Sequence, residues 1–167
     1  MHLPSISAFI AACLSFTSLA HADLTIFYPD EKNAVFSIKA PEGWEFEAGT
    51  EEDPYCTLSK DDTVLSFCTV EGDEDSLEEA IEGTYEYVRE TYPKAELPTP
   101  GKTTIDGKAA VAAAGSGKDT EGTLTQFGFA WVFVGEDKIA ELWFEVPESD
   151  EDLLKEAAEI LKSFKAR

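Results

Sequence analysis

The sequence predicts an α+β domain in which helices pack on a mainly antiparallel sheet. Two stretches, 76–92 and 149–164, have the apolar spacing of amphipathic helices. Runs of β-prone residues precede each of them, which gives the order strands-helix-strands-helix. Tight turns join successive runs, and such turns connect antiparallel neighbours. Helices on an antiparallel sheet form an α+β layer fold.

The first group of strands ends in a predicted hairpin around the polar turn Lys60-Asp61-Asp62. With Asp62 at the centre of this turn, Cys56 lies directly opposite Cys68. Directly opposed residues have the Cβ separation that a disulfide needs, and two cysteines in an oxidising compartment most simply pair. We therefore expect a Cys56–Cys68 disulfide. The strands predicted in this group are 24–28, 35–40, 44–47, 55–59 and 63–70.

The first predicted helix begins at a capping box formed by Ser76 and Glu79 and ends before Pro93. The second begins at the similar pair Ser149 and Asp152. Each helix has one apolar face for packing on the sheet. These faces are formed by Leu77, Ala80, Ile81, Thr84, Tyr85, Val88 and Tyr92, and by Leu153, Leu154, Ala157, Ile160, Leu161 and Phe164.

Two more hairpins are predicted between the helices. Strands 103–105 and 108–114 flank Asp106-Gly107, a strong turn signal, and strands 123–134 and 138–146 flank Glu136-Asp137. If Glu136-Asp137 is a two-residue turn, Trp131 faces Leu142 and the bulky side chains share one face. This predicted core face consists of Phe127, Phe129, Trp131, Phe133, Ala140, Leu142, Phe144 and Val146.

The reverse face of the last hairpin carries the candidate ligand site. Trp143 lies on that face, and Glu141 and Glu145 flank it at alternate positions of the strand. An aromatic ring bordered by carboxylates can hold an apolar or cationic ligand. The alternative is that the first helix or the segment 94–101 covers Trp143, which is then ordinary core packing. The small neighbours expected beside Trp143 are Gly128, Ala130 and Val132.

Residues 1–22 are typical of a signal peptide. They contain no acidic or basic residue other than histidine, they are largely apolar, and they end in Ala20-His21-Ala22. Cleavage after Ala22 leaves one domain, 23–167, that is periplasmic or secreted, and no transmembrane segment is expected. The alternative is a lipoprotein anchored through Cys13, because Ile10-Ala11-Ala12-Cys13 is similar to a lipobox.

The chain is strongly acidic, with a formal net charge of −21. Such a surface repels nucleic acids and anionic lipid headgroups, so neither is expected as a partner. The charge indicates high solubility, or attraction to an unknown protein or small ligand of positive charge.

Several chemistries are missing from the predicted mature chain. Both histidines, His2 and His21, lie in the predicted signal peptide, which removes imidazole-based nucleophile systems and most zinc designs. No metal site and no cofactor are expected, and two acidic clusters are interpreted as helix caps.

A non-catalytic binding or structural module is therefore predicted. The alternative is a carboxylate-dependent hydrolase, which needs a cleft with one buried Glu or Asp beside an aromatic ring. The two acidic clusters interpreted above as helix caps are Glu71, Asp73, Glu74 and Asp75, and Glu148, Asp150, Glu151 and Asp152.

Three segments carry a family resemblance. Residues 36–46 are similar to an "F-x-x-x-x-P-x-G-W" opening, a strand enters through Asp106-Gly107 after the first helix, and residues 159–164 are similar to a terminal "I-L-x-S-F". In this order and spacing the chain resembles the PsbP-like α/β superfamily, which includes the extrinsic photosystem II subunit PsbP and bacterial DcrB-type envelope proteins. The resemblance implies a non-enzymatic envelope or lumenal protein that binds partners. PsbP supports a calcium- and chloride-dependent metal centre, but no residue set here carries that role over.

Overall fold

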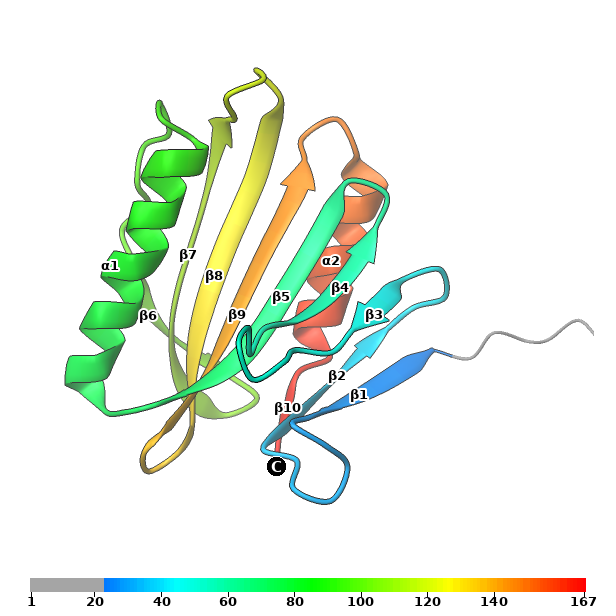
Figure 1. The fold of residues 1–167 in the computed structure, drawn as a ribbon, viewed down its shortest axis with the longest axis vertical. Helices are drawn as coiled ribbons and strands as arrows, with labels where there is room; N and C mark the ends of the chain where they lie inside the picture. Colours follow the sequence, from blue (N-terminus) through cyan, green and yellow to red (C-terminus); the bar gives the residue numbers. More distant parts are fainter. Residues whose placement is uncertain (1–22) are drawn as a thin grey trace, which may run out of the picture.

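The computed structural model describes residues 23–167, so the predicted signal peptide 1–22 and the lipidation candidate Cys13 lie outside the described residues. Two sheets and two helices form the domain (Figure 1). Neighbouring strands in both sheets run antiparallel, which confirms the α+β prediction. Within residues 23–167, neither helix combines the length and the apolar character needed to cross a bilayer.

The large sheet has seven strands, and the small sheet has three. The large sheet is ordered β3 (Glu45–Glu47), β4 (Cys56–Lys60), β5 (Thr63–Glu71), β9 (Lys138–Pro147), β8 (Leu124–Gly135), β7 (Lys108–Lys118) and β6 (Gly101–Ile105). The small sheet is ordered β1 (Leu24–Tyr28), β2 (Phe36–Ala40) and β10 (Lys165–Ala166). The helices are α1 (Glu74–Thr91) and α2 (Glu151–Lys162).

The two ends of the described chain meet in the small sheet. β10 pairs with β2, and the ring of Phe164 stacks on Phe36 at 5.1 Å. Trp44 donates a hydrogen bond from Nε1 to Glu156 of α2, at 2.8 Å. The opening and closing segments of the family resemblance are therefore packing contacts between α2 and the first strands. β10 was not predicted, because two residues after a helix carry no strand pattern.

Both predicted helix caps are shifted. Asp73, not Ser76, caps α1, and its carboxylate accepts from the backbone N–H groups of Asp75 and Ser76. Asp150, not Ser149, caps α2 and accepts from Leu153 N–H. The interpretation of the acidic clusters as cap-forming segments is correct for both helices, since carboxylates satisfy open N–H groups there.

The expected disulfide is not formed. Lys60 pairs with Thr63, so the turn contains two residues rather than three, and Asp61 adopts a positive φ of 50°. This change of one residue places Cys56 opposite Phe67. Cys68 then lies on the other face of the sheet, since successive side chains of a strand alternate. Both cysteines are buried free thiols.

A β-bulge at Val134 overturns the predicted faces of the last hairpin. Gly135 pairs with Lys138 as expected, but the register shifts by one residue between Gly135 and Phe133. Trp131 consequently faces Glu141 rather than Leu142, and Phe129 faces Trp143 rather than Phe144. A one-residue shift exchanges the two faces of a strand relative to its partner. The large aromatic residues of β8 therefore share the face of Trp143.

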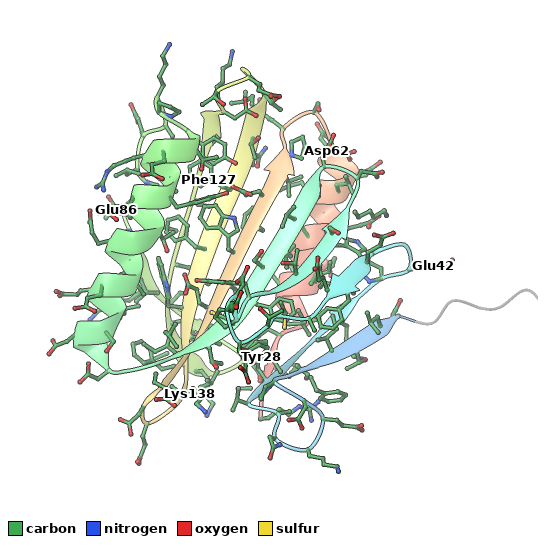
Figure 2. All side chains as sticks on the ribbon, viewed as in Figure 1. Tyr28, Glu42, Asp62, Glu86, Phe127 and Lys138 are labelled. Atoms are coloured by element: carbon green, nitrogen blue, oxygen red, sulfur yellow. The ribbon has the colours of Figure 1, made fainter. Side chains whose placement is uncertain are left out.

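The helices cover opposite faces of the large sheet. Leu77 and Val88 of α1 belong to one core cluster with Phe127, Phe129 and Trp131 of β8. The apolar face of α2 belongs to the other cluster, with the reverse face of β8 and β9 and with the small sheet. Phe127 lies between α1 and the strands in Figure 2, whereas Glu86 lies on the outer side of α1.

The absence of a side chain at Gly128 allows the Phe144 ring to approach β8 closely. A Cβ at this position would lie 2.3 Å from Cε1 of Phe144 and 3.2 Å from the Ala113 carbonyl oxygen. We predict that Gly128→Ala lowers the free energy of unfolding by about 1–3 kcal/mol, because overpacking forces the ring out of place. Urea unfolding measures this change.

The matched control is Gly101→Ala, since a Cβ at Gly101 would meet only the Ala112 carbonyl oxygen at 3.9 Å. The free energy of unfolding of Gly101→Ala should stay within about 0.5 kcal/mol of the wild-type value. Equal losses in both variants would show that the Phe144 contact is not the cause.

Candidate functional site

A cleft of about 620 Å³ opens between α1, the inner face of β4, β5 and β9, and the segment around Asp53. We call it the α1 cleft. Its wall includes Glu141, Trp143 and Glu145, the three residues predicted as a ligand site. They lie together because alternate residues of a strand share one face. The lining contains three carboxylates, those of Asp53, Glu141 and Glu145, and no lysine, arginine or histidine.

Trp143 forms the middle of the cleft wall. Its ring lies parallel to those of Phe129 and Phe127, with centroids 5.6 Å and 6.0 Å away, and the Tyr87 ring of α1 meets it edge-on at 5.2 Å. In β5, the other strand next to β9, the residue paired with Trp143 is the small Ser66. The predicted small neighbours Gly128, Ala130 and Val132 are wrong, because the bulge moves them to the opposite face.

The alternative interpretation of Trp143 is correct in part. α1 packs on Trp143 and leaves the residue half-buried. The connector after α1 joins the same cluster through Ala95 and Leu97, and the Tyr85 hydroxyl donates to the Pro98 carbonyl. Trp143 is thus both a packing residue and part of the cleft wall.

Glu141 places a nearly buried carboxylate at one end of the cleft. The residue is only 8% exposed. Its Oε2 accepts from the Tyr55 hydroxyl at 2.9 Å, and Cys68 Sγ lies 4.0 Å away. Its Oε1 lies 3.4 Å from the Thr84 hydroxyl, which also donates to the Ala80 carbonyl at 2.9 Å. All these partners are neutral. Burial therefore raises the pKa of Glu141, and the hydrogen bonds only partly oppose this effect.

The groups around Glu141 are affected by its charge. Burial and the neighbouring Glu141 raise the pKa of the Cys68 thiol to about 12 and raise that of the Tyr55 hydroxyl. A thiol that rarely ionises is slow in disulfide exchange. The buried Trp131 Nε1 makes no hydrogen bond to the described residues, but it lies near enough to Glu141 to favour its ionised form.

Glu145 defines the other end of the cleft. Its Oε1 accepts from the Tyr87 hydroxyl at 3.0 Å and the Tyr92 hydroxyl at 2.8 Å. Burial and the nearby carboxylate raise the pKa of both tyrosines, so each stays protonated and donates. Glu145 is half-buried and more accessible than Glu141.

Gly83 lies in the middle of α1 where this helix borders the cleft. A Cβ at this position would meet no atom within 4 Å. Packing therefore does not require glycine here, although glycine destabilises a helix interior by about 1 kcal/mol relative to alanine. Its effect on the structure is to keep the cleft wall open beside Thr84.

Sequence reasoning found only part of this site. The alternation of Glu141, Trp143 and Glu145 is a local signal and was sufficient to group them. Tyr55 and Thr84 were missed as partners of Glu141, because they come from a loop and a helix that are distant in the sequence. The carboxylates of this site can hold a positively charged group, whereas its tyrosine hydroxyls already donate to those carboxylates. Residues 23–167 contain no group of three His, Cys, Asp or Glu side chains placed to hold a metal ion.

Comparison with known proteins identifies the fold. No model of a known protein family matches the sequence, and no curated protein sequence matches it. Among solved structures, the chain is similar to the cyanobacterial PsbP (CyanoP) of Synechocystis sp. PCC 6803, with a TM-score of 0.60 and 14% identity. The match covers 92% of this chain and 99% of the other. The fold is PsbP-like. At this identity the similarity establishes the architecture of the PsbP-like domain and leaves its ligand to be argued from the cleft.

Glu141→Gln tests the electrostatics of the PsbP-like domain without a ligand. Because the pKa of Glu141 in the folded state is raised above the ordinary glutamate value of 4.5, the folded state holds the proton more tightly than the unfolded state. The free energy of unfolding therefore falls as pH rises through the folded pKa, and a glutamine removes this loss. We predict that the melting temperature of Glu141→Gln, minus that of the wild type, increases from pH 4 to pH 8.

The control is Glu86→Gln, which removes the same charge from an exposed position on α1. The melting temperature of Glu86→Gln, minus that of the wild type, should change little from pH 4 to pH 8. A Glu141→Gln difference that stays constant or decreases with pH would contradict a raised pKa.

Proposed function

We propose that the chain is an exported, non-catalytic accessory protein whose PsbP-like domain binds a small organic cation in the α1 cleft. One observation carries this proposal. Glu141 is 8% exposed beside Trp143, it has only neutral hydrogen-bond partners, and no basic residue lines the cleft.

The energetics favour a cationic ligand. A buried carboxylate without an opposite charge is destabilising, and a cation in the cleft would relieve that penalty. The half-buried Trp143 ring lines the cleft and offers a further attraction of about 0.5–2 kcal/mol for a cation. The net charge of −21 raises the local concentration of cations around the whole domain.

Export is supported by residues 1–22, which have the composition and the A-x-A end of a signal peptide. We predict that intact mass spectrometry of the protein from the envelope or secreted fraction gives a chain beginning at Asp23. A lipid-modified N-terminal Cys13 would contradict cleavage after Ala22 and make the protein membrane-anchored.

A carboxylate-dependent hydrolase is the second candidate, because Glu141 is a buried acid with a raised pKa beside aromatic rings. Its geometry is less suitable. Glu145 is four residues further along the same strand, so the two Cα atoms are about 13 Å apart, and Trp143 lies between them. A glycosidase needs its two carboxyl groups about 5–9.5 Å apart with the scissile bond between them, whereas Trp143 occupies the strand position between Glu141 and Glu145. Turnover of nitrophenyl glycosides that is lost in Glu141→Gln would favour the hydrolase.

Calorimetric titration with butylamine, with 1-butanol as the neutral analogue, tests the binding proposal. We predict heat of binding for butylamine alone. Glu141→Gln should abolish it, because the charge is lost while the acceptor for Tyr55 remains. Glu86→Gln, with the same change of charge outside the cleft, should bind like the wild type.

Gly83 provides a steric test of the same site. Gly83→Leu fills the open wall of the cleft and should block butylamine, whereas Gly83→Ala should retain binding and raise stability by about 0.5–1 kcal/mol. Binding that survives both Gly83→Leu and Glu141→Gln would place the amine outside the cleft.

A further inference from the structure

We infer that the α1 cleft selects a linear polyamine, with one terminal ammonium at Glu141, the other at Glu145 and the methylene chain along Trp143. This inference rests on the proposed function and adds the ligand class. The cleft contains two separated anionic ends with an aromatic surface between them, and a ligand with a single charge can use only one of these ends.

The spacing of the two ends is set by the strand. Glu141, Trp143 and Glu145 occupy alternate positions of β9, and in β5 they pair with Cys68, Ser66 and Val64. At 3.3–3.4 Å per residue, the outer two Cα atoms are separated by about 13 Å along a nearly straight line. An extended chain with a charge at each end matches this arrangement, whereas a compact dication does not.

The two ends differ in chemistry. At the Glu141 end, both carboxylate oxygens are engaged by neutral hydroxyls in a nearly closed environment, and Asp53 adds a second carboxylate to the lining. At the Glu145 end, two tyrosine hydroxyls share Oε1, and no hydrogen bond from residues 23–167 reaches Oε2. Each end thus presents acceptor capacity to an ammonium group, which carries only donors.

The middle of the cleft suits methylene groups. Trp143 and the exposed ring of Tyr87 supply apolar surface, and Gly83 and Ser66 are small enough to leave a passage beside it. A chain of CH₂ groups gains from contact with this surface and needs no hydrogen-bond partner. A peptide would instead require partners for its backbone N–H and C=O groups there.

The test uses calorimetry of the full protein with a matched pair of probes. 1,8-Diaminooctane carries two ammonium groups, whereas 8-amino-1-octanol replaces one with a neutral hydroxyl at the same length. We expect the diamine to bind about fivefold more tightly than the amino alcohol, which corresponds to one partly exposed ion pair. 1,3-Diaminopropane is too short to reach both ends and should bind no better than the amino alcohol.

The variants separate the two ends. Glu145→Gln retains an acceptor for both tyrosines and should remove the preference for the diamine over the amino alcohol. Glu141→Gln should weaken both probes about 30-fold or more, because its ion pair is buried. Glu86→Gln should change the affinity for neither probe.

The outcomes distinguish the two proposals. If both probes bind equally and Glu141→Gln weakens both, the polyamine inference is wrong and the cation-binding function stands. If neither probe binds, both proposals are wrong. If 1,3-diaminopropane binds as tightly as 1,8-diaminooctane, the two charges share one end of the cleft and the inference is overturned.

Discussion

The bulge at Val134 is the constraint on which the rest of the structure depends. One unpaired residue near the β8–β9 turn shifts the register of all later pairs, so that Trp131 faces Glu141 and Phe129 faces Trp143. The aromatic rings of β8 then pack beneath α1 with the Glu-Trp-Glu alternation of β9. Without the bulge, Trp143 would lie away from those rings. The α1 cleft is thus a consequence of one irregular position in an otherwise regular sheet.

Two features of the cleft are unfavourable for folding, and the proposed cation binding depends on both. A carboxylate is buried with neutral partners at Glu141, and a glycine lies in the interior of α1 at Gly83, where packing does not require it. Elsewhere the charged groups follow ordinary rules: Asp73 and Asp150 cap helices, and Glu156 joins α2 to Lys60 and Trp44. Local violations that cluster in one cleft of a consistent fold are typical of a functional site.

The sequence was sufficient for features set by local patterns. Helical spacing, turn residues such as Asp106-Gly107 and strand alternation predicted the element order and the α+β class. Register was not predictable, because neither the two-residue turn at Asp61-Asp62 nor the extra residue at Val134 has a distinctive pattern. The disulfide and the predicted core face failed for this reason. Glu141, Trp143 and Glu145 were grouped correctly because alternation along one strand does not depend on its partner.

Glu141 is a buried carboxylate, and a cation is its proposed partner. Carbon-13 NMR of the glutamate carboxyl groups, with Glu141 assigned by its absence in Glu141→Gln, measures its titration directly. We predict a pKa above the ordinary glutamate value of 4.5 in the free protein and a lower pKa when the protein is saturated with 1,8-diaminooctane. A carboxyl group that titrates normally in the free protein, or whose pKa is unchanged by the amine, would contradict it.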